Sequence, residues 1–269
     1  MKMKRLAGLT VALLMVLCTY GANKPLLLTT PAEYQLMNVS PNGKWACGVY
    51  VDYNDQARGF LWNLQSGTFT LLSTLTESEA WAVSNDGTVV GVFQHSDPNS
   101  STASYECPGT WKDSKWTVME LPEGYKSGRA FAITPDGKYT CGVVTQNYTY
   151  LGYIWKEGKI YRQLNASGIA IPYAISPDGQ EATGWIERLN RTACYFKKDG
   201  SVKDLSSYQS IWSVGKGFSP DGNKILYWGG YDWSSEDLTQ CWGVYDIATG
   251  DSTAVPMYVK NADFDFFQM

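Results

Sequence analysis

The chain has a single histidine, His95, among its 269 residues. A Ser-His-Asp triad would have to use that one imidazole, and no G-x-S-x-G nucleophile motif accompanies it. Zinc sites draw on several histidine and cysteine ligands, and no C-x-x-C spacing occurs, so we expect no metal site. His95 falls in a Ser- and Asn-rich stretch from Gln94 to Tyr105. We interpret that stretch as a long loop and His95 as a solvated loop histidine.

Clusters of basic residues are missing beyond the first five positions, and the formal net charge is −4. This charge distribution argues against a nucleic-acid partner. The sequence also lacks a phosphate-cradling loop, a dinucleotide fingerprint and an EF-hand, so we expect no cofactor.

Only one long apolar run occurs, from Leu6 to Leu17, behind Lys2, Lys4 and Arg5. At a bilayer-spanning minimum of about 20 residues it is too short for a membrane helix, and it resembles the apolar core of a secretory signal. We expect residues 1–22 to be a signal peptide and residues 23–269 a single exported domain. The predicted location is periplasmic, cell-surface or extracellular. A lipid anchor at Cys18 is the less favoured alternative, because bulky Leu17 stands where a small residue is required.

One turn pattern occurs five times: an apolar residue, Ser or Thr, Pro or Asn, Asp or Asn, then Gly. The copies end at Gly43, Gly87, Gly137, Gly179 and Gly222, at intervals of 44, 50, 42 and 43 residues. A period of about 40–45 residues fits a four-stranded propeller blade or a two-helix HEAT-type unit. The turn residues and the short β-type runs beside them favour the blade.

A second motif follows each turn, for example Gly59-Phe60-Leu61-Trp62 and Gly152-Tyr153-Ile154-Trp155. In most copies a further Gly-containing turn and a short β-type run come next, so each repeat supplies four strands. The pattern resembles the TolB-type, WD40-like β-propeller repeats with an "SPDG" turn. It is also similar to bacterial extracellular repeats that pair an "SxDG" turn with an "AFLW"-like strand. The resemblance covers roughly residues 25–258.

This resemblance implies an all-β propeller of four-stranded antiparallel blades, five in number. Six blades stay open, because Asp263 to Phe267 reads as one further strand. Pro25 to Thr30 reads as an outermost strand placed before the first blade, which would close the ring beside the last one.

The mature chain carries five cysteines, an odd number, at Cys47, Cys107, Cys141, Cys194 and Cys241. Cys47 and Cys141 each follow a repeat glycine by four residues, so they occupy equivalent strands of different blades. That equivalence favours unbridged core cysteines over a disulfide, although an exported protein would permit one.

By analogy with known propellers, two sets of connections emerge on one face: from the second to the third strand, and from the fourth strand to the next blade. These are the variable connections, and variable loops on a rigid scaffold commonly carry binding. We therefore predict a non-catalytic scaffold that binds a protein, peptide or glycan on this face. The predicted ligand-binding residues are Tyr53, Tyr148, Trp212 and Trp233 as flat anchors, with Asn147 and Arg188 as polar partners.

Two alternatives stay open at this point. A glycosidase would use paired carboxylates over the central funnel, and Asp52, Glu187 and Asp232 come from three different blades. An assembly component of the cell envelope, as TolB-like proteins are, would rest on the fold resemblance alone. The repeated Ser176 and Asp178 are turn-formers by default, because five equivalent turns require the same residue types.

Overall fold

The computed structural model describes residues 34–52, 56–73, 76–97, 103–164, 168–188, 190–206, 212–229 and 240–257. No helix occurs in these ranges, and so none that could span a membrane. The twenty strands are β1 (Tyr34–Val39), β2 (Trp45–Val51), β3 (Ala57–Asn63), β4 (Phe69–Leu71), β5 (Ser78–Val83), β6 (Val89–Ser96), β7 (Ser104–Lys112), β8 (Lys115–Val118), β9 (Ser127–Ile133), β10 (Tyr139–Gln146), β11 (Thr149–Lys156), β12 (Lys159–Gln163), β13 (Ala170–Ile175), β14 (Ala182–Glu187), β15 (Arg191–Phe196), β16 (Val202–Asp204), β17 (Val214–Phe218), β18 (Lys224–Gly229), β19 (Gln240–Asp246) and β20 (Ser252–Met257).

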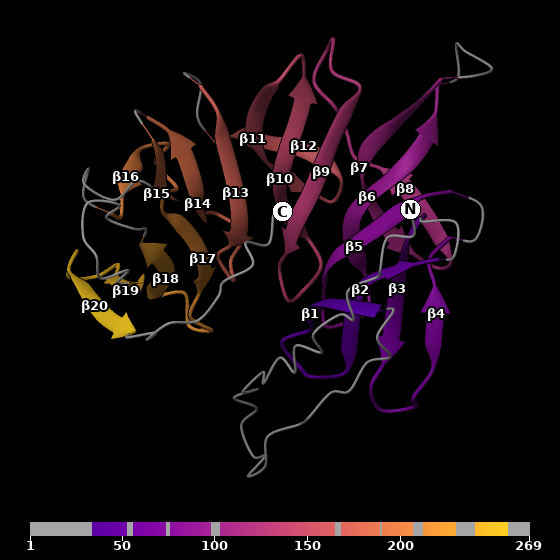
Figure 1. Ribbon diagram of the computed structural model, residues 1–269, viewed down its shortest axis with the longest axis horizontal. Coiled ribbons are helices and arrows are strands. Elements are labelled where there is room, and N and C mark those ends of the chain that lie inside the picture. Colours follow the sequence, from indigo (N-terminus) through magenta and orange to yellow (C-terminus); the bar gives the residue numbers. More distant parts are fainter. Residues whose placement is uncertain are drawn as a thin grey trace, which may run out of the picture.

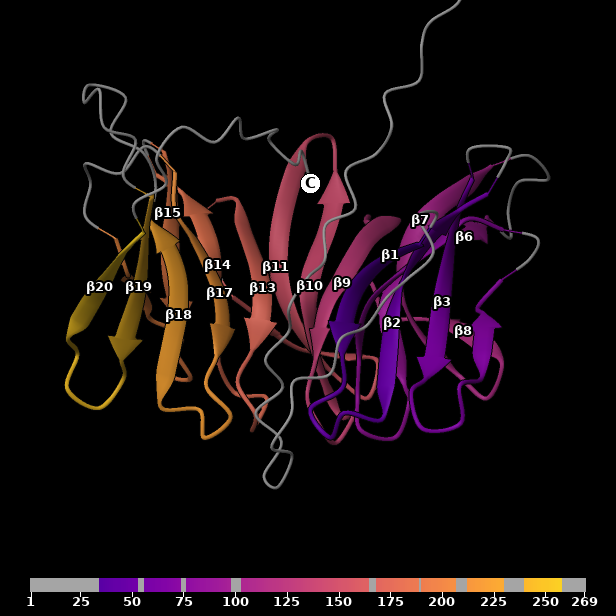
Figure 2. The ribbon, with the colours of Figure 1, turned by 60° about the horizontal axis from the view of Figure 1, so that its bottom comes forward.

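The strands form five antiparallel four-stranded sheets, each in sequence order. The sheets stand side by side around a common centre, with the first strand of each nearest to it (Figures 1 and 2). The predicted propeller and its five blades are thereby confirmed. The segments predicted to close the ring or add a sixth blade, Pro25–Thr30 and Asp263–Phe267, lie outside the described residues.

Each blade packs against the next through the apolar faces of its sheet. Between the third and fourth blades, for example, Cys141 and Ile154 meet Ile186 and Phe196, all almost fully buried. In the described ranges, each blade packs extensively against the next, from the first blade to the fifth. The described residues of the fifth blade do not pack in this way against those of the first. The core is therefore a series of four interlayers between neighbouring sheets.

The cysteines belong to these interlayers. Cys47, Cys107, Cys141 and Cys194 are buried and unbridged, which confirms the expectation for Cys47 and Cys141. Burial raises the pKa of Cys107 to about 11. Thiols held in their neutral form in this way are poor nucleophiles, so these residues act as packing groups. The side chain of Cys241 lies outside the described part of the structure.

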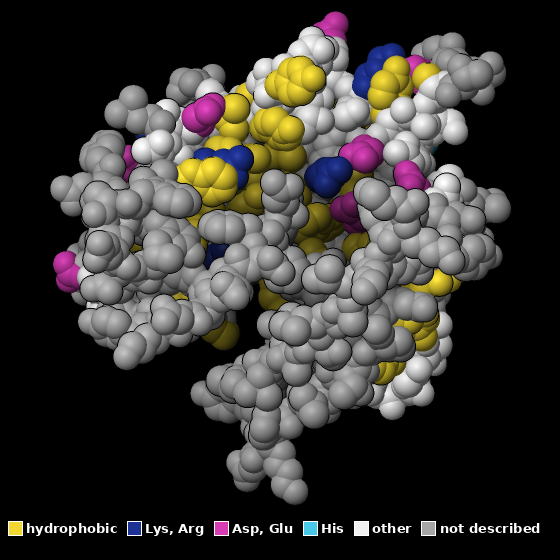
Figure 3. All heavy atoms as spheres, in the orientation of Figure 1, with side chains coloured by type: hydrophobic (Ala, Val, Ile, Leu, Met, Phe, Trp, Pro, Cys, Tyr) yellow, Lys and Arg dark blue, Asp and Glu magenta, His cyan; other side chains and the backbone are white. Residues whose placement is uncertain are grey.

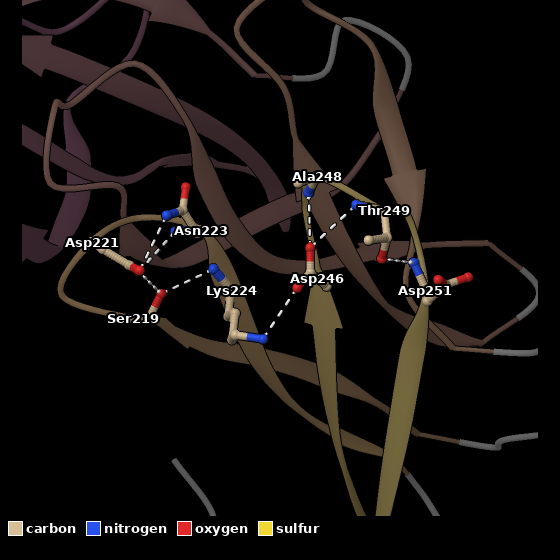
Figure 4. A network of polar contacts seen from close by, with 8 residues as sticks. All are labelled: Ser219, Asp221, Asn223, Lys224, Asp246, Ala248, Thr249 and Asp251. Carbon is tan, nitrogen blue, oxygen red and sulfur yellow. Dashed lines mark hydrogen bonds and ion pairs between the residues drawn. The ribbon is translucent and has the colours of Figure 1, made fainter.

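The repeated turns join the first and second strands of each blade. In the fifth blade, the Ser219 hydroxyl donates to Asp221 at 2.5 Å and accepts the backbone N–H of Lys224 at 2.9 Å (Figure 4). Asp221 also accepts the N–H of Asn223 at 3.1 Å. The other four turns repeat the hydroxyl–carbonyl or hydroxyl–carboxylate contact at 2.5 to 2.8 Å. Each turn thus needs a hydroxyl and an Asp or Asn for its own backbone, and the prediction that these residues are structural is confirmed.

Turns of successive blades also contact one another. Asn42 donates its amide to the carbonyl of Asn85 at 2.9 Å, and the N–H of Asn85 reaches the carbonyl of Pro135 at 3.0 Å. We call the edge that carries these turns the turn rim, and the opposite edge the loop rim. In Figure 2 the turn rim is at the bottom, and the hairpin that joins β10 to β11 projects at the top.

One turn carboxylate gives a pH-dependent prediction. Partial burial pushes the pKa of Asp86 upward, but the ammonium of Lys112 and the hydroxyl of Ser84 outweigh it and hold that pKa well below its usual range. The charged form therefore stabilises the fold above the unfolded-state pKa of about 4. Asp86→Asn should lower the free energy of unfolding by about 1 kcal/mol at pH 7.

The difference in the free energy of unfolding between this variant and the unmutated protein should shrink as the pH falls below about 4. Protonation then removes the same charge from Asp86 itself. Urea unfolding at several pH values measures it. Asp113→Asn, which removes a carboxylate from an exposed turn of the same blade, is the matched control. A loss that stayed constant down to pH 2 would contradict this account.

A β-bulge interrupts the first strand of every blade, three residues before the Ser or Thr of its turn. The bulged residues are Met37, Trp81, Phe131, Tyr173 and Lys216. In the first four blades a glycine of the second strand faces the bulge: Gly48, Gly91, Gly142 and Gly184. A Cβ added to any of them would lie 1.9 to 2.1 Å from a carbonyl oxygen of the bulged strand. The fifth blade carries Tyr227 there, with Gly215 and Gly217 in the facing strand.

Candidate binding site

The bulges bring a row of large side chains to the innermost strands, as bulges commonly re-aim a side chain. The ring centroids of Trp81 and Phe131 lie 5.3 Å apart, and those of Phe131 and Tyr173 lie 5.2 Å apart. The ammonium of Lys216 lies 5.8 Å from the centre of the Tyr173 ring. We call these four residues the inner girdle. They come from four consecutive blades, so the lining near the centre is continuous from β5 to β17.

A second aromatic group surrounds Arg191, the first residue of β15. Its guanidinium carbon lies 4.8 Å from the ring centre of Trp185 and 4.3 Å from that of Trp212. Trp212 precedes β17 and is fixed by a parallel bridge to Arg191, beside which the N–H of Ser213 donates to the Arg191 carbonyl at 3.0 Å. Trp185 is 7% exposed and Trp212 is 47% exposed. The stack is therefore anchored in the core at one end and open to solvent at the other.

The two groups meet in one apolar cluster. Trp185 belongs to the same cluster as Phe131, Tyr173 and Val214, formed by the third, fourth and fifth blades. In Figure 3 hydrophobic side chains gather over the third and fourth blades, beside Lys, Arg, Asp and Glu side chains. We call the surface formed by the inner girdle with Trp185, Arg191 and Trp212 the mouth.

Charges at the mouth are of two kinds. Arg129 is neutralised, since its Nη2 lies 2.7 Å from Glu106 and its Nη1 lies 3.7 Å from Glu79. Glu79 also accepts the indole N–H of Trp81 at 3.0 Å. Arg191 and Lys216, in contrast, have no carboxylate partner among the described residues. Water can reach Lys216, yet the surrounding protein removes part of its solvation and lowers its pKa.

The four predicted binding residues that the structure describes lie in three places. Trp212 is part of the mouth. Arg188 lies at the end of β14 in the same blade as Trp185, with its guanidinium 3.9 Å from Asp204. Asn147 and Tyr148 form the two-residue turn between β10 and β11, with φ of 48° and 64°, and Tyr148 is 93% exposed at its tip.

The third blade thus has a tight hairpin where the sequence suggested a longer loop, because β10 and β11 stay paired up to Gln146 and Thr149. The other two predicted anchors, Tyr53 and Trp233, lie outside the described residues.

The expected loop around His95 is also shorter than predicted. β6 and β7 remain paired out to Ser96 and Ser104, so His95 lies within β6, opposite Tyr105. Its ring contacts Phe93 with centroids 5.8 Å apart. The prediction that His95 lies in a loop is therefore wrong, because the hairpin pairing continues through polar residues, whereas its side chain is exposed as expected.

Of the three carboxylates of the alternative enzymatic interpretation, the structure describes two, in different blades. Asp52 follows β2 in the first blade, where the guanidinium of Arg58 lies 3.4 Å away. Glu187 ends β14 in the fourth blade and is exposed, and Asp232 lies outside the described residues. In the described ranges no three His, Cys, Asp or Glu side chains are grouped closely enough to hold a metal ion.

Sequence reasoning overlooked the inner girdle, Trp185 and the stacking of Arg191. The girdle had a detectable signal, because a large residue stands three positions before the Ser or Thr of every turn. The contact between Arg191 and Trp212 had none, since the two residues belong to different blades.

No protein-family model matches the sequence, and no curated protein sequence matches it either. Solved structures do. TolB from Agrobacterium tumefaciens superposes with a TM-score of 0.57 at 19% identity, over 85% of this chain and 83% of that one. TolB from Acinetobacter baumannii gives 0.56 at 15% identity, over 87% of this chain and 57% of that one, so this chain spans little more than half its length. An oligogalacturonate lyase from Vibrio parahaemolyticus gives 0.56 at 13% identity, over 85% and 68%. At these identities the comparisons establish a TolB-like β-propeller fold.

Proposed function

We propose that this protein is an exported binding scaffold that holds its ligand at the mouth, over the second to fifth blades, without transforming it. The observation that carries the proposal is the stack of Trp185, Arg191 and Trp212 beside the inner girdle. The leader in residues 1–22 supports export, as predicted from its basic and apolar segments.

Binding sites combine apolar and aromatic surface with a few fixed polar groups. The mouth has this composition. Trp212 offers about half of its surface to solvent, and its backbone is tied to β15, so a ligand would meet a flat apolar surface that is already ordered. An aromatic surface that is ordered before binding reduces the entropic cost of binding.

The charges at the mouth favour binding over catalysis. Glycoside hydrolysis needs one protonated carboxyl group and a second carboxylate nearby. Glu79 and Glu106 are the carboxylates of this surface that contact the same guanidinium, and Arg129 holds both in ion pairs. The oligogalacturonate lyase has the same fold as the TolB proteins, so the fold is compatible with either activity and only the side chains distinguish them.

Trp212→Ala should weaken binding of the physiological ligand at least tenfold, as loss of a central aromatic anchor commonly does. The measurement is binding of the mature protein to glycan arrays and to partners captured by pull-down. Tyr161→Ala is the matched control, because Tyr161 is 46% exposed but lies in β12, the outermost strand of its blade. Unchanged binding in the Trp212 variant, or an equal loss in both variants, would place the ligand elsewhere.

A further inference from the structure

Arg191 and Lys216 are unusual among the cations at the mouth because the described residues leave them unneutralised. Both rest on rings of one cluster, Arg191 on Trp185 and Lys216 on Tyr173. Arg129, in β9 of the third blade, shows the contrasting arrangement with two carboxylates. In the described part of the fourth and fifth blades, these two cations lie on aromatic rings without an ion pair, with Glu187 opposite Arg191 in the register of β14 and β15.

Cations in this setting favour carboxylate ligands. A guanidinium stacked between two rings keeps its N–H groups at its edge, and these groups fit the two oxygens of a carboxylate as parallel hydrogen bonds. An ammonium that has lost part of its hydration gains more from an anion than one in open water. Neither cation has a described hydrogen-bond acceptor that would compete.

The flat surface beside the cations narrows the choice of anion. Trp212 presents an indole face next to Arg191. A uronic acid carries a flat C–H face and a carboxylate in one unit, so one residue can stack on the indole while it pairs with the guanidinium. An acidic peptide supplies the carboxylate on a flexible stem, without a flat face in the same residue.

We propose that the mouth binds an acidic glycan, with uronate carboxylates on Arg191 and Lys216 and a sugar ring on Trp212. This inference rests on the proposed binding function and names its ligand class. The two cations lie in neighbouring blades, so each would bind a carboxylate on a different sugar unit of one polysaccharide. Because the protein carries a formal charge of −4, a polyanion would be held at the mouth and repelled elsewhere.

The test uses an array of uronate-containing polysaccharides, each matched to its carboxyl-reduced form, in which every uronate has become a neutral sugar. We expect the mature protein to bind at least one acidic polymer and to lose at least tenfold in affinity for its reduced counterpart. Affinity should also fall as salt rises from about 50 to 300 mM, since screening weakens the charge pairs.

Three variants test the two cations. Lys216→Met and Arg191→Gln should each weaken binding of the acidic polymer about tenfold to a hundredfold. Arg191→Lys should retain part of the affinity that Arg191→Gln loses. Lysine keeps the positive charge but lacks the parallel N–H groups of the guanidinium. The control is Lys44→Met, which removes an exposed charge from the turn rim. Thermal unfolding of each variant separates lost binding from lost folding.

Equal binding to acidic and reduced polymers, or binding only to poly-glutamate and acidic peptides, would overturn the acidic-glycan inference and leave the scaffold function standing. Failure to bind any uronate polymer would also overturn it. Failure of the scaffold function itself would appear separately, as the absence of any effect of Trp212→Ala on whatever ligand the protein captures.

Discussion

Gly142→Val is expected to lower the free energy of unfolding by about 3 kcal/mol or more. Gly142 faces the bulge of β9, and a Cβ at this position would lie 2.1 Å from the carbonyl oxygen of Arg129 and 2.8 Å from the Cα of Ala130. Both are backbone atoms of a strand in the middle of the propeller, so neither can move aside as a flexible side chain would. Valine would force β9 and β10 apart and disturb the girdle residue Phe131.

The control for this substitution is Gly217→Ala. No atom lies within 4 Å of a Cβ added to Gly217, its φ is ordinary, and the aligned positions of the second to fourth blades are Ala82, Ala132 and Ala174. This change should leave stability unaltered or raise it by up to about 1 kcal/mol, because alanine restricts the unfolded chain. Chemical denaturation of both variants measures the contrast. Comparable stability of the two would mean that the bulges do not require glycine opposite them.

Trp155→Ala should lower the free energy of unfolding by about 3 to 5 kcal/mol, the range for removing a large aromatic side chain from a core. Trp155 is fully buried between the second and third blades, and its indole N–H donates to the carbonyl of Glu120 at 2.7 Å. The substitution leaves a cavity against Met119 and Val144 and leaves that carbonyl without its donor. Guanidinium unfolding monitored by circular dichroism gives the value.

Leu226→Ala provides the comparison, since Leu226 lies in β18 and is 41% exposed. Its truncation should change the free energy of unfolding by less than about 1 kcal/mol. A loss below 1 kcal/mol for Trp155→Ala would contradict the view that packing between blades supplies most of the stability, because this residue fills one of only four described interlayers.

The architecture was predictable because the sequence repeats it. Five turns with the same backbone geometry need the same hydroxyl and carboxylate or amide, and their spacing equals the length of four strands and their connections. Gly48, Gly91, Gly142 and Gly184 were visible in the same way, although their role as partners of bulges was not. The residues that recur in the sequence are therefore those that every blade needs for its own fold.

The mouth was less predictable because it is built from differences between blades. Trp212 was identified from its exposed connection, but Trp185 and Arg191 acquire their role only through contacts that the curvature of the propeller creates. The polar residues around His95 suggested a loop, whereas cross-strand hydrogen bonds extend that hairpin whatever its side chains are. Periodic patterns predict strands, but they carry no information on which single residues meet between neighbouring blades.

The contacts along the turn rim have a mechanical consequence. Asn42, Asn85 and Pro135 join the first three blades along this edge, because the side-chain amide of Asn42 donates to the carbonyl of Asn85 and the N–H of Asn85 donates to the carbonyl of Pro135. Contacts of this kind keep neighbouring sheets at one spacing along the turn rim. The position of each of these blades therefore depends on that of its neighbours.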